Sequence, residues 1–434
     1  MMHLKNIAIA LSFIVAILPA KRNAGTDGND IALPSELYML PKSSNNLFSQ
    51  SYIRRWNPYE YYVRVNGDCF FERRLPEVST VVNPKDECHI NIDLIRSADF
   101  DTLASKSILV HVRNRPIGTR NVTAQIIGDS FVQGAFYRTA LVDSMYVPGL
   151  TTIGLRKLAR SENHYDEGRG GWTLKDYFSI SKDEFSPYSG FMQPSDACRY
   201  LGACRFWINC HKVNKGELND FESRYQCGRF EECCMRFDSE TGLPVHPQKD
   251  DLMWDNDRKC YIRYNGEKWE RATDIHEEEW SFNYPKYLAI WNLRAPDFLF
   301  ETLGLNDFRD ELNPDYAEWD RLLTLMKESY LEANPKGKFA IVIPCSSCGS
   351  LNNKRGDFTI RQNACMWQFR KHLIDTFDNR RQEGFYIVDM GITIDNENGY
   401  KVDADGLQTG NPHPYLNYPT MGMPLAAFIQ YHRK

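Results

Sequence analysis

The hydrophobic and polar positions of the chain follow two different patterns. Between residues 61 and 112, apolar residues alternate with polar ones, most clearly at Tyr61, Val63 and Val65. A period of two is typical of strands that bury one face, and turn residues separate the alternating stretches. The pattern therefore predicts a small antiparallel, β-sandwich-like domain over residues 51–118.

Beyond residue 119, strands are indicated by continuous apolar runs, and stretches with helical spacing separate them. The runs lie at 124–127, 147–155, 298–303, 339–343 and 385–390, and the helical stretches at 132–144, 316–331, 362–377 and 421–432. Strands that are apolar throughout are buried on both faces, as in a parallel sheet covered by helices on both sides. We therefore expect an α/β domain over residues 119–434.

The stretch from about residue 190 to 284 interrupts this alternation. It is charged, rich in cysteine and without long periodic segments. Long insertions of this kind are commonly binding loops or lids. We interpret it as an insertion beside the carboxyl edge of the sheet, held together by disulfides.

Twelve cysteines are present, all of them after residue 68. An even number in an exported chain favours disulfides. We expect a bond between Cys69 and Cys88, and most of the others to be closed within residues 198–260. Zinc is the alternative, because Cys345 and Cys348 form a CxxC pair, but a second close pair of ligands is missing from the sequence.

The amino terminus has the layout of a secretory signal peptide. Lys5 precedes an apolar run over residues 7–18, and a small-residue cleavage site ends at Ala20. The run is too short for a comfortable membrane span, and we expect no stable membrane insertion. The predicted order is a signal peptide over 1–20, a polar linker over 21–50 and a mature protein that is secreted or periplasmic.

The charge and composition of the chain limit the classes of partner that it can bind. The formal net charge of −5 argues against a nucleic-acid partner. Aromatic residues make up 13% of the chain, which suits a carbohydrate-facing surface and a large core equally well. The oligomeric state is left open.

The candidate chemistry lies in short polar blocks that follow the predicted strands. Ser130 ends a Gly-Asp-Ser turn, Gly171 lies in a glycine-rich turn, Asn306 follows a Gly-Leu pair, and His413 lies between two prolines. In a parallel sheet these blocks meet at the carboxyl edge. Together they supply a nucleophile, oxyanion donors and a general base, which are the parts of an acyl-transfer site.

In these blocks the chain resembles the SGNH hydrolases, the GDSL-type esterases and lipases. The resemblance covers about residues 123–434 without the insertion. It implies a flavodoxin-like three-layer α/β/α fold with Ser130 as nucleophile and His413 as base. The oxyanion hole would comprise the backbone N–H of Ser130, that of Gly171 (Gly170 is the second choice) and the side-chain amide of Asn306.

The last block departs from the pattern of that family, which has Asp three residues before its His. The position is Gly410 in this chain. Asp403 or Asp405 could orient the imidazole from a longer loop, Asn411 could do so through its side-chain oxygen, or a backbone carbonyl could serve. We rank Asp405 first, because a carboxylate orients the imidazole and stabilises its cation.

The resemblance implies a secreted serine esterase that needs no metal or other cofactor. Export, the β domain and the insertion are similar to those of relatives that remove acetyl groups from glycans, so we expect an acylated carbohydrate or another small ester as substrate. Two alternatives stay open. The first is a lipase or lysophospholipase that uses the same residues, and the second is a glycan-binding module whose esterase site has decayed.

Overall fold

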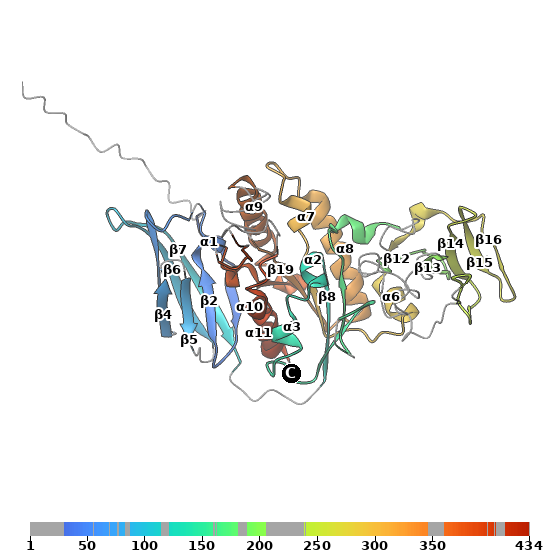
Figure 1. The fold of residues 1–434 in the computed structure, drawn as a ribbon, viewed down its shortest axis with the longest axis horizontal. Helices are drawn as coiled ribbons and strands as arrows, with labels where there is room; N and C mark the ends of the chain where they lie inside the picture. Colours follow the sequence, from blue (N-terminus) through green and yellow to red (C-terminus); the bar gives the residue numbers. More distant parts are fainter. Residues whose placement is uncertain are drawn as a thin grey trace, which may run out of the picture.

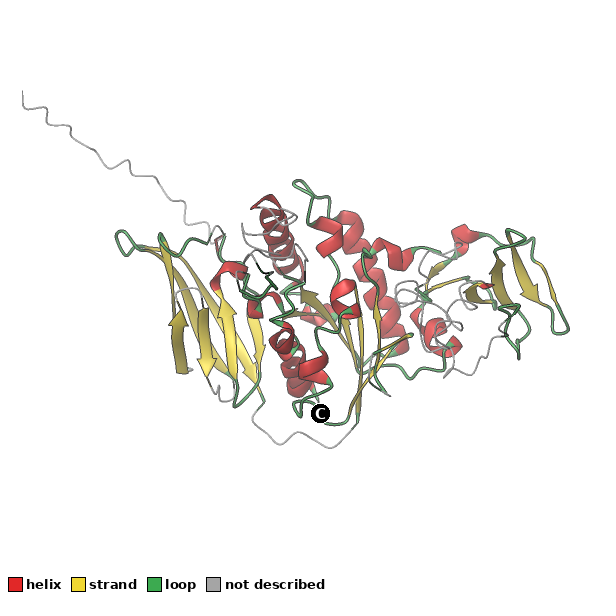
Figure 2. Ribbon diagram, viewed as in Figure 1, coloured by secondary structure: helices red, strands yellow, loops and turns green. Residues whose placement is uncertain are grey.

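The protein combines a mixed α/β domain with several smaller sheets (Figure 2). The computed structural model describes residues 30–54, 56–68, 70–75, 78–82, 87–113, 121–158, 161, 163–180, 189–204, 238, 240–345, 360–396, 398–402, 404 and 413–433. Figure 1 shows the N-terminal sheets at one end of the molecule, the α/β domain in the middle and the strands of residues 251–271 at the other end. The expected signal peptide lies outside the described residues and stays a prediction.

The central sheet has seven strands in the order β10-β11-β8-β18-β19-β20, with β9 also paired to β8. Its strands are β8 (Val122–Gly128), β9 (Leu150–Ile153), β10 (Arg156–Lys157), β11 (Tyr165–Gly168), β18 (Phe298–Glu301), β19 (Lys338–Ile343) and β20 (Phe385–Asp389). Every pairing is parallel except that of β10 with β11. The predicted α/β class with a parallel sheet is confirmed, whereas the three-layer arrangement stays a prediction.

The apolar runs became central strands because both faces of the sheet are covered. Ile126 and Ile127 of β8 and Ile341 and Val342 of β19 are fully buried. Consecutive side chains of a strand point to opposite faces, so burial of neighbours requires packing on both sides. The parallel pairing of β8 with β11 and β18 aligns the carboxyl ends of these three strands.

Helices flank this sheet. They are α2 (Ser130–Gln133), α3 (Arg138–Leu141), α6 (Tyr284–Ile290), α7 (Leu305–Phe308), α8 (Ala317–Ala333), α9 (Ile360–Phe377), α10 (Tyr418–Met421) and α11 (Met423–His432), with 3₁₀ turns η2 (Lys175–Phe178), η4 (Arg381–Glu383) and η5 (Gly391–Thr393). Helix α8 packs on β19, and both α9 and α11 contact β20. The predicted helices over 316–331, 362–377 and 421–432 are confirmed.

The predicted continuous helix over residues 132–144 is wrong. Helix α2 ends at Gln133, and α3 begins only at Arg138. Ala135, between them, has a φ of 57°, in the left-handed region that does not continue a right-handed helix. The chain therefore turns directly after the segment that carries Ser130.

The N-terminal region forms two sheets, in the orders β1-β7-β6-β3 and β2-β5-β4. Their strands are β1 (Glu36–Met39), β2 (Ser44–Phe48), β3 (Tyr61–Gly67), β4 (Phe70–Leu75), β5 (Val78–Val82), β6 (Cys88–Arg96) and β7 (Thr102–Val112), and α1 (Ser49–Tyr52) follows β2. The alternation of apolar and polar residues thus marked β3, β6 and β7 correctly.

The predicted polar linker over residues 21–50 is wrong from residue 30 onward. Strand β1 pairs in parallel with β7, and β2 pairs antiparallel with β5. Asn45 is buried because its side chain bonds the backbone N–H and C=O of Leu40. The polar composition of this segment alone predicts a linker, but its pairing with strands distant in the sequence gives it a regular structure.

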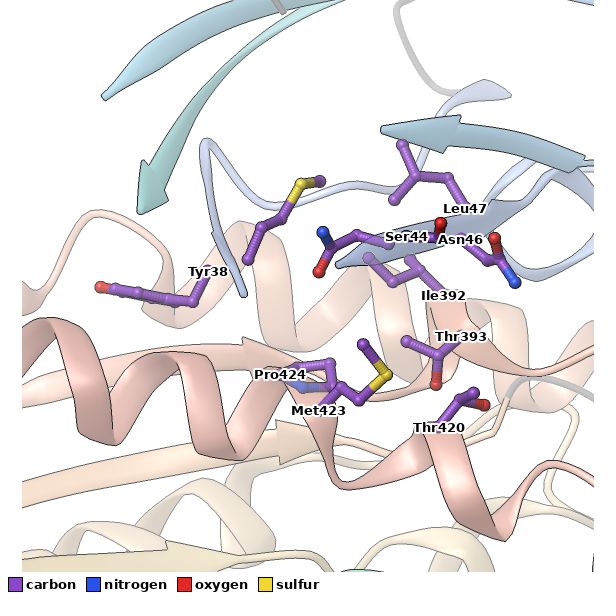
Figure 3. A pocket seen from close by; sticks show the side chains of 11 residues that line it. Tyr38, Ser44, Asn46, Leu47, Ile392, Thr393, Thr420, Met423 and Pro424 are labelled. Carbon is purple, nitrogen blue, oxygen red and sulfur yellow. The ribbon is translucent and has the colours of Figure 1, made fainter. Parts of the chain in front are cut away.

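The N-terminal sheets pack directly on the α/β domain. Helix α11 contacts β1, β7 and β20, and β2 contacts η5. A pocket opens along this interface between β1 and β2 on one side and η5, α10 and α11 on the other (Figure 3). Its lining includes Asn46, Thr393 and Thr420. The pocket is therefore lined by residues of both the N-terminal sheets and the α/β domain.

The insertion carries strands of its own. They are β12 (Met192–Gln193), β13 (Arg199–Ala203), β14 (Asp251–Asp255), β15 (Cys260–Tyr264), β16 (Trp269–Arg271) and β17 (Ser281–Phe282), with the 3₁₀ turn η3 (Glu277–Glu279). Strands β13 to β16 form one sheet and β12 pairs with β17. Figure 1 shows β14, β15 and β16 beyond α6 and α8, at the end of the molecule opposite to the N-terminal sheets.

The cysteines only partly follow the expected pattern. Cys198, Cys204 and Cys260 of the insertion are thiols, so disulfides at these described positions are not confirmed. Cys198 and Cys204 are buried in the core and Cys260 is partly buried against it, where a thiol packs as a small apolar side chain. Cys88 is disulfide-bonded. Cys69 and Cys348 lie outside the described residues, so the Cys69–Cys88 pairing and the CxxC alternative stay predictions.

Within the described ranges, helices long and apolar enough to cross a bilayer are absent.

Candidate active site

Ser130 lies at the turn from the central strand β8 into helix α2. The strand ends at Gly128, Asp129 is the N-cap, and Ser130 is the first residue of the helix. The Asp129 carboxylate accepts a hydrogen bond of 2.9 Å from the backbone N–H of Phe131. Capping is therefore the task of Asp129, and the Ser130 hydroxyl is not needed for it.

Asn306 lies next to this turn in α7, directly after β18. Its Nδ2 donates to the backbone carbonyl of Trp172 at 3.0 Å and lies 3.4 Å from Oδ2 of Asp129. The preceding Gly304 has a φ of 109°, and a Cβ there would lie 2.1 Å from the Phe369 ring. Only glycine fits this turn, which aims Asn306 at Asp129.

The glycine-rich turn after β11 joins the same cluster. The backbone N–H of Leu174 donates to Oδ1 of Asp307 at 3.0 Å, and Asn306 holds the carbonyl of Trp172. Gly171, directly before Trp172, is exposed, has a φ of 81°, and has open space where a Cβ would point. The residue predicted as an oxyanion donor is therefore on a turn that Asn306 and Asp307 hold in place.

His413 reaches this cluster from the end of the chain. Its ring stacks on that of Phe131, with centroids 4.9 Å apart and planes at 6°. Nδ1 lies 2.7 Å from the hydroxyl of Tyr418, the first residue of α10. Burial lowers the pKa of His413 to about 4, so the imidazole is neutral at neutral pH.

The structure thus brings Ser130, the Gly171 turn, Asn306 and His413 to the carboxyl ends of β8, β11 and β18. Asp405, the predicted orienting residue, lies outside the described residues, as do the alternatives Asp403 and Asn411. The structure adds Tyr418, which sequence reasoning missed. Nothing in the sequence marks this tyrosine except its position five residues after His413.

Carboxyl groups are concentrated beneath the site. Burial raises the pKa of Asp129 to about 7, that of Glu301 to about 8 and that of Asp307 to about 6. The negative charges add to this, because Asp307 raises the pKa of both other groups. Glu301 accepts from the N–H of Leu303 at 2.7 Å through Oε1, while its buried Oε2 has no hydrogen-bond partner among the described residues.

These pKa values predict a stability that falls as the pH rises. Burial raises the pKa of Glu301 from 4.5 to about 8, so the folded state retains a proton that the unfolded chain has lost. The stabilisation of the folded state by protonated Glu301 is fully present below pH 4.5 and is lost as the pH rises to about 8. When the pH is raised from about 5 to 8, the free energy of unfolding of the wild type should fall. That of Glu301→Gln should fall by at least about 1 kcal/mol less.

Urea unfolding at several pH values measures this difference. Glu318→Gln on the exposed face of α8 is the control and should leave the pH dependence of the wild type unchanged. Parallel pH curves for Glu301→Gln and the wild type would contradict a buried, protonated Glu301.

A metal site is not found in this part of the molecule. Among the described residues, clusters of at least three His, Cys, Asp or Glu side chains suited to holding an ion are absent.

Comparisons with known proteins add limited information. The chain matches no protein-family model and no curated protein. It is similar to a carbohydrate esterase of family 3 from Talaromyces cellulolyticus, with 11% identity over 71% of this chain and 98% of that chain and a TM-score of 0.31. It is also similar to protein YXIM of Bacillus subtilis, with 10% identity over 82% of this chain and 67% of that chain and a TM-score of 0.23. Both TM-scores are low, so we base the proposal below on the residues of the site.

Proposed function

We propose that the protein is a serine esterase of the SGNH hydrolase type. The observation that carries the proposal is the convergence of Ser130, Asn306 and His413 from distant parts of the chain. Asn306 lies against the cap of the serine helix, and the imidazole stacks on the residue that follows the serine. Nucleophile, oxyanion donor and base are the groups that ester hydrolysis through an acyl-enzyme requires.

The proposed reaction begins with attack of Ser130 Oγ on the ester carbonyl. Nε2 of His413 takes the hydroxyl proton and passes it to the leaving alcohol oxygen, so an acyl-serine and an alcohol form. Water then attacks the acyl-serine, with His413 again taking and returning the proton, and releases the acid. Burial lowers the pKa of His413 to about 4, so the imidazole is neutral at neutral pH and free to accept the proton, but it is a weaker base than an exposed histidine.

The oxyanion of each tetrahedral intermediate needs donors that are already in position. The first N–H groups of α2 have no acceptor within the helix, and we assign the second backbone donor to the N–H of Gly171, which lies on the exposed part of its turn. Nδ2 of Asn306 forms a hydrogen bond of 3.0 Å to the carbonyl of Trp172, whereas its contact to Oδ2 of Asp129 is long at 3.4 Å. We propose that the second N–H of the Asn306 amide, which makes this long contact, donates a hydrogen bond to the oxyanion.

Replacing Asn306 by Ala should lower kcat by about 100- to 1000-fold with a much smaller change in KM, because the donor acts mainly in the transition state. Steady-state hydrolysis of p-nitrophenyl acetate measures both constants. Asn334→Ala is the matched control, since its Nδ2 donates to the Pro296 carbonyl beyond α8, away from the site. A kcat for Asn306→Ala within about threefold of wild type would contradict the oxyanion role.

For the substrate, we propose an acetyl ester on a glycan. Support comes from the resemblance of the sequence to exported esterases that carry an extra β domain and an insertion. A series of p-nitrophenyl esters of increasing chain length, together with acetate release from acetylated xylan and acetylated sialic acid, tests this choice. Preference for acetyl esters and release of acetate would support it, whereas preference for long acyl chains would favour the lipase alternative.

We also propose that the enzyme acts outside the cytoplasm, as the signal-like amino terminus indicates. Determining the amino-terminal residue of the protein recovered from its native host would test this. A mature chain that begins near residue 21 would support export, and an intact Met1 would contradict cleavage.

A further inference from the structure

The partner of His413 within the described site is a tyrosine. Nδ1 and the Tyr418 hydroxyl oxygen are 2.7 Å apart, which is a short, well-formed hydrogen bond. The stacking on Phe131 at 6° fixes the ring plane at the same time. The imidazole is therefore held both in its plane and at one of its nitrogens.

A base at Nε2 requires the proton of the neutral ring to be on Nδ1. Each ring nitrogen either donates or accepts one hydrogen bond, so the group at Nδ1 selects the tautomer. A carboxylate can only accept, and in a Ser-His-Asp triad it enforces the Nδ1–H form. A tyrosine oxygen can accept the same proton.

We propose that Tyr418 is the positioning residue of His413 and takes the place that a carboxylate has in a Ser-His-Asp triad. The inference rests on the proposed function, because it concerns the base of that reaction. In this arrangement Nδ1–H donates to the Tyr418 oxygen, which leaves Nε2 without a proton and able to accept that of Ser130. When Nε2 takes the serine proton, the imidazolium keeps the same bond to the tyrosine.

The surroundings leave room for this hydroxyl. A Cβ at Gly134 would lie 2.9 Å from the Tyr418 oxygen, so glycine there gives the hydroxyl its space. Helix α10 contacts α3 on one side and η5 and α11 on the others, which fixes the backbone of Tyr418. Burial raises the pKa of Tyr418, so its hydroxyl stays protonated and neutral.

A neutral partner has a cost in rate. A tyrosine stabilises the imidazolium by its dipole and not by a full charge, which is a weaker interaction in a buried site. It can also rotate and donate to Nδ1, which would place the ring proton on Nε2 and stop its function as a base. We therefore expect a slower enzyme than one with a carboxylate at this position.

The test compares Tyr418→Phe with the wild type, because Phe removes only the hydroxyl. We expect kcat for p-nitrophenyl acetate to fall about 10- to 100-fold while KM changes less than about twofold. Tyr431→Phe is the control, since its hydroxyl bonds Glu87 at the N-terminal sheets. Thermal melting of all variants verifies that they are folded.

A second measurement does not depend on turnover. In the full-length wild type labelled with ¹⁵N-histidine, the His413 resonances, assigned with a His413→Gln variant, should report a proton on Nδ1. In Tyr418→Phe the ¹⁵N shifts should move toward a mixture of both tautomers. An Nε2–H tautomer in the wild type, or shifts unchanged by the loss of the hydroxyl, would overturn the inference.

The alternative orienting residues are tested in parallel. Loss of kcat in Asp405→Asn or Asp403→Asn, with full activity in Tyr418→Phe, would assign the role to the loop carboxylate and overturn the inference. A wild type that hydrolyses no ester would refute the proposed function. The ¹⁵N measurement would still decide whether Tyr418 selects the tautomer, so the two failures are distinguishable.

Discussion

Replacing Ser130 by Ala should lower esterase activity by at least about a thousand-fold, the largest effect on activity that we expect for any single substitution. The physical reason is that no acyl-enzyme forms without the hydroxyl, and what remains is catalysis by the oxyanion donors alone. The variant should fold like the wild type, because Asp129 and not Ser130 caps α2. Hydrolysis of p-nitrophenyl acetate by both proteins measures the difference.

A fluorophosphonate probe gives an independent readout of the same residue. It reacts with activated serines, so it should label the wild type at Ser130 and leave Ser130→Ala unlabelled. Ser105→Ala is the matched control, because its hydroxyl donates to Asp93 in the N-terminal sheet, remote from the site. Equal activity and labelling of wild type and Ser130→Ala would refute Ser130 as the nucleophile. If both folded proteins were inert and unlabelled, the alternative of a decayed glycan-binding module would be favoured.

The largest effect on stability should come from the buried pair of Arg370 and Asp389. Arg370 in α9 and Asp389 at the end of β20 form two hydrogen bonds, one of them 2.9 Å between Nη1 and Oδ1, and both side chains are at most 1% exposed. Nε of Arg370 also donates to the carbonyl of Ala32 at 2.6 Å. One guanidinium therefore joins the central sheet, a helix and the segment before β1.

Asp389→Ala should lower the free energy of unfolding by about 3–5 kcal/mol, because the guanidinium is left buried without its counter-charge. Urea unfolding monitored by circular dichroism measures this. The control is Glu318→Ala, which breaks the solvent-exposed ion pair with Arg321 and should change the free energy of unfolding far less, because solvent screens that pair. A loss below about 1 kcal/mol for Asp389→Ala would contradict the role that we assign to the pair.

Replacing both partners should be less damaging than removing one. In Arg370→Met with Asp389→Leu no charge remains buried, so part of the lost stability should return. The bond to Ala32 would still be missing, and recovery should therefore be incomplete. Comparison of the single and double variants separates the uncompensated charge from the lost link to the N-terminal segment.

The sequence by itself determined the elements whose burial is uniform. The runs that became β19 and β20 are apolar throughout because both of their faces are covered, and this shows in the residues themselves. The alternation of apolar and polar residues in β3 and β6 likewise predicted these strands from the sequence. The sequence also predicted that Ser130 and Asn306 lie at one edge, since parallel strands align their carboxyl ends.

Only the tertiary structure decided the features that depend on distant partners. Strand β2 contains Ser44, Asn45 and Asn46, which read as loop residues, and its pairing with β5 makes it a strand. Glu301 stands in an apolar run, but only the packing shows that burial, and to a lesser degree the nearby Asp307 and Asp129, raises its pKa. The partner of His413 is likewise a matter of packing. The sequence shows that a tyrosine stands at position 418, but not that its hydroxyl reaches Nδ1 of His413. That contact depends on the stacking of the His413 ring on Phe131 and on the space that Gly134 leaves for the hydroxyl.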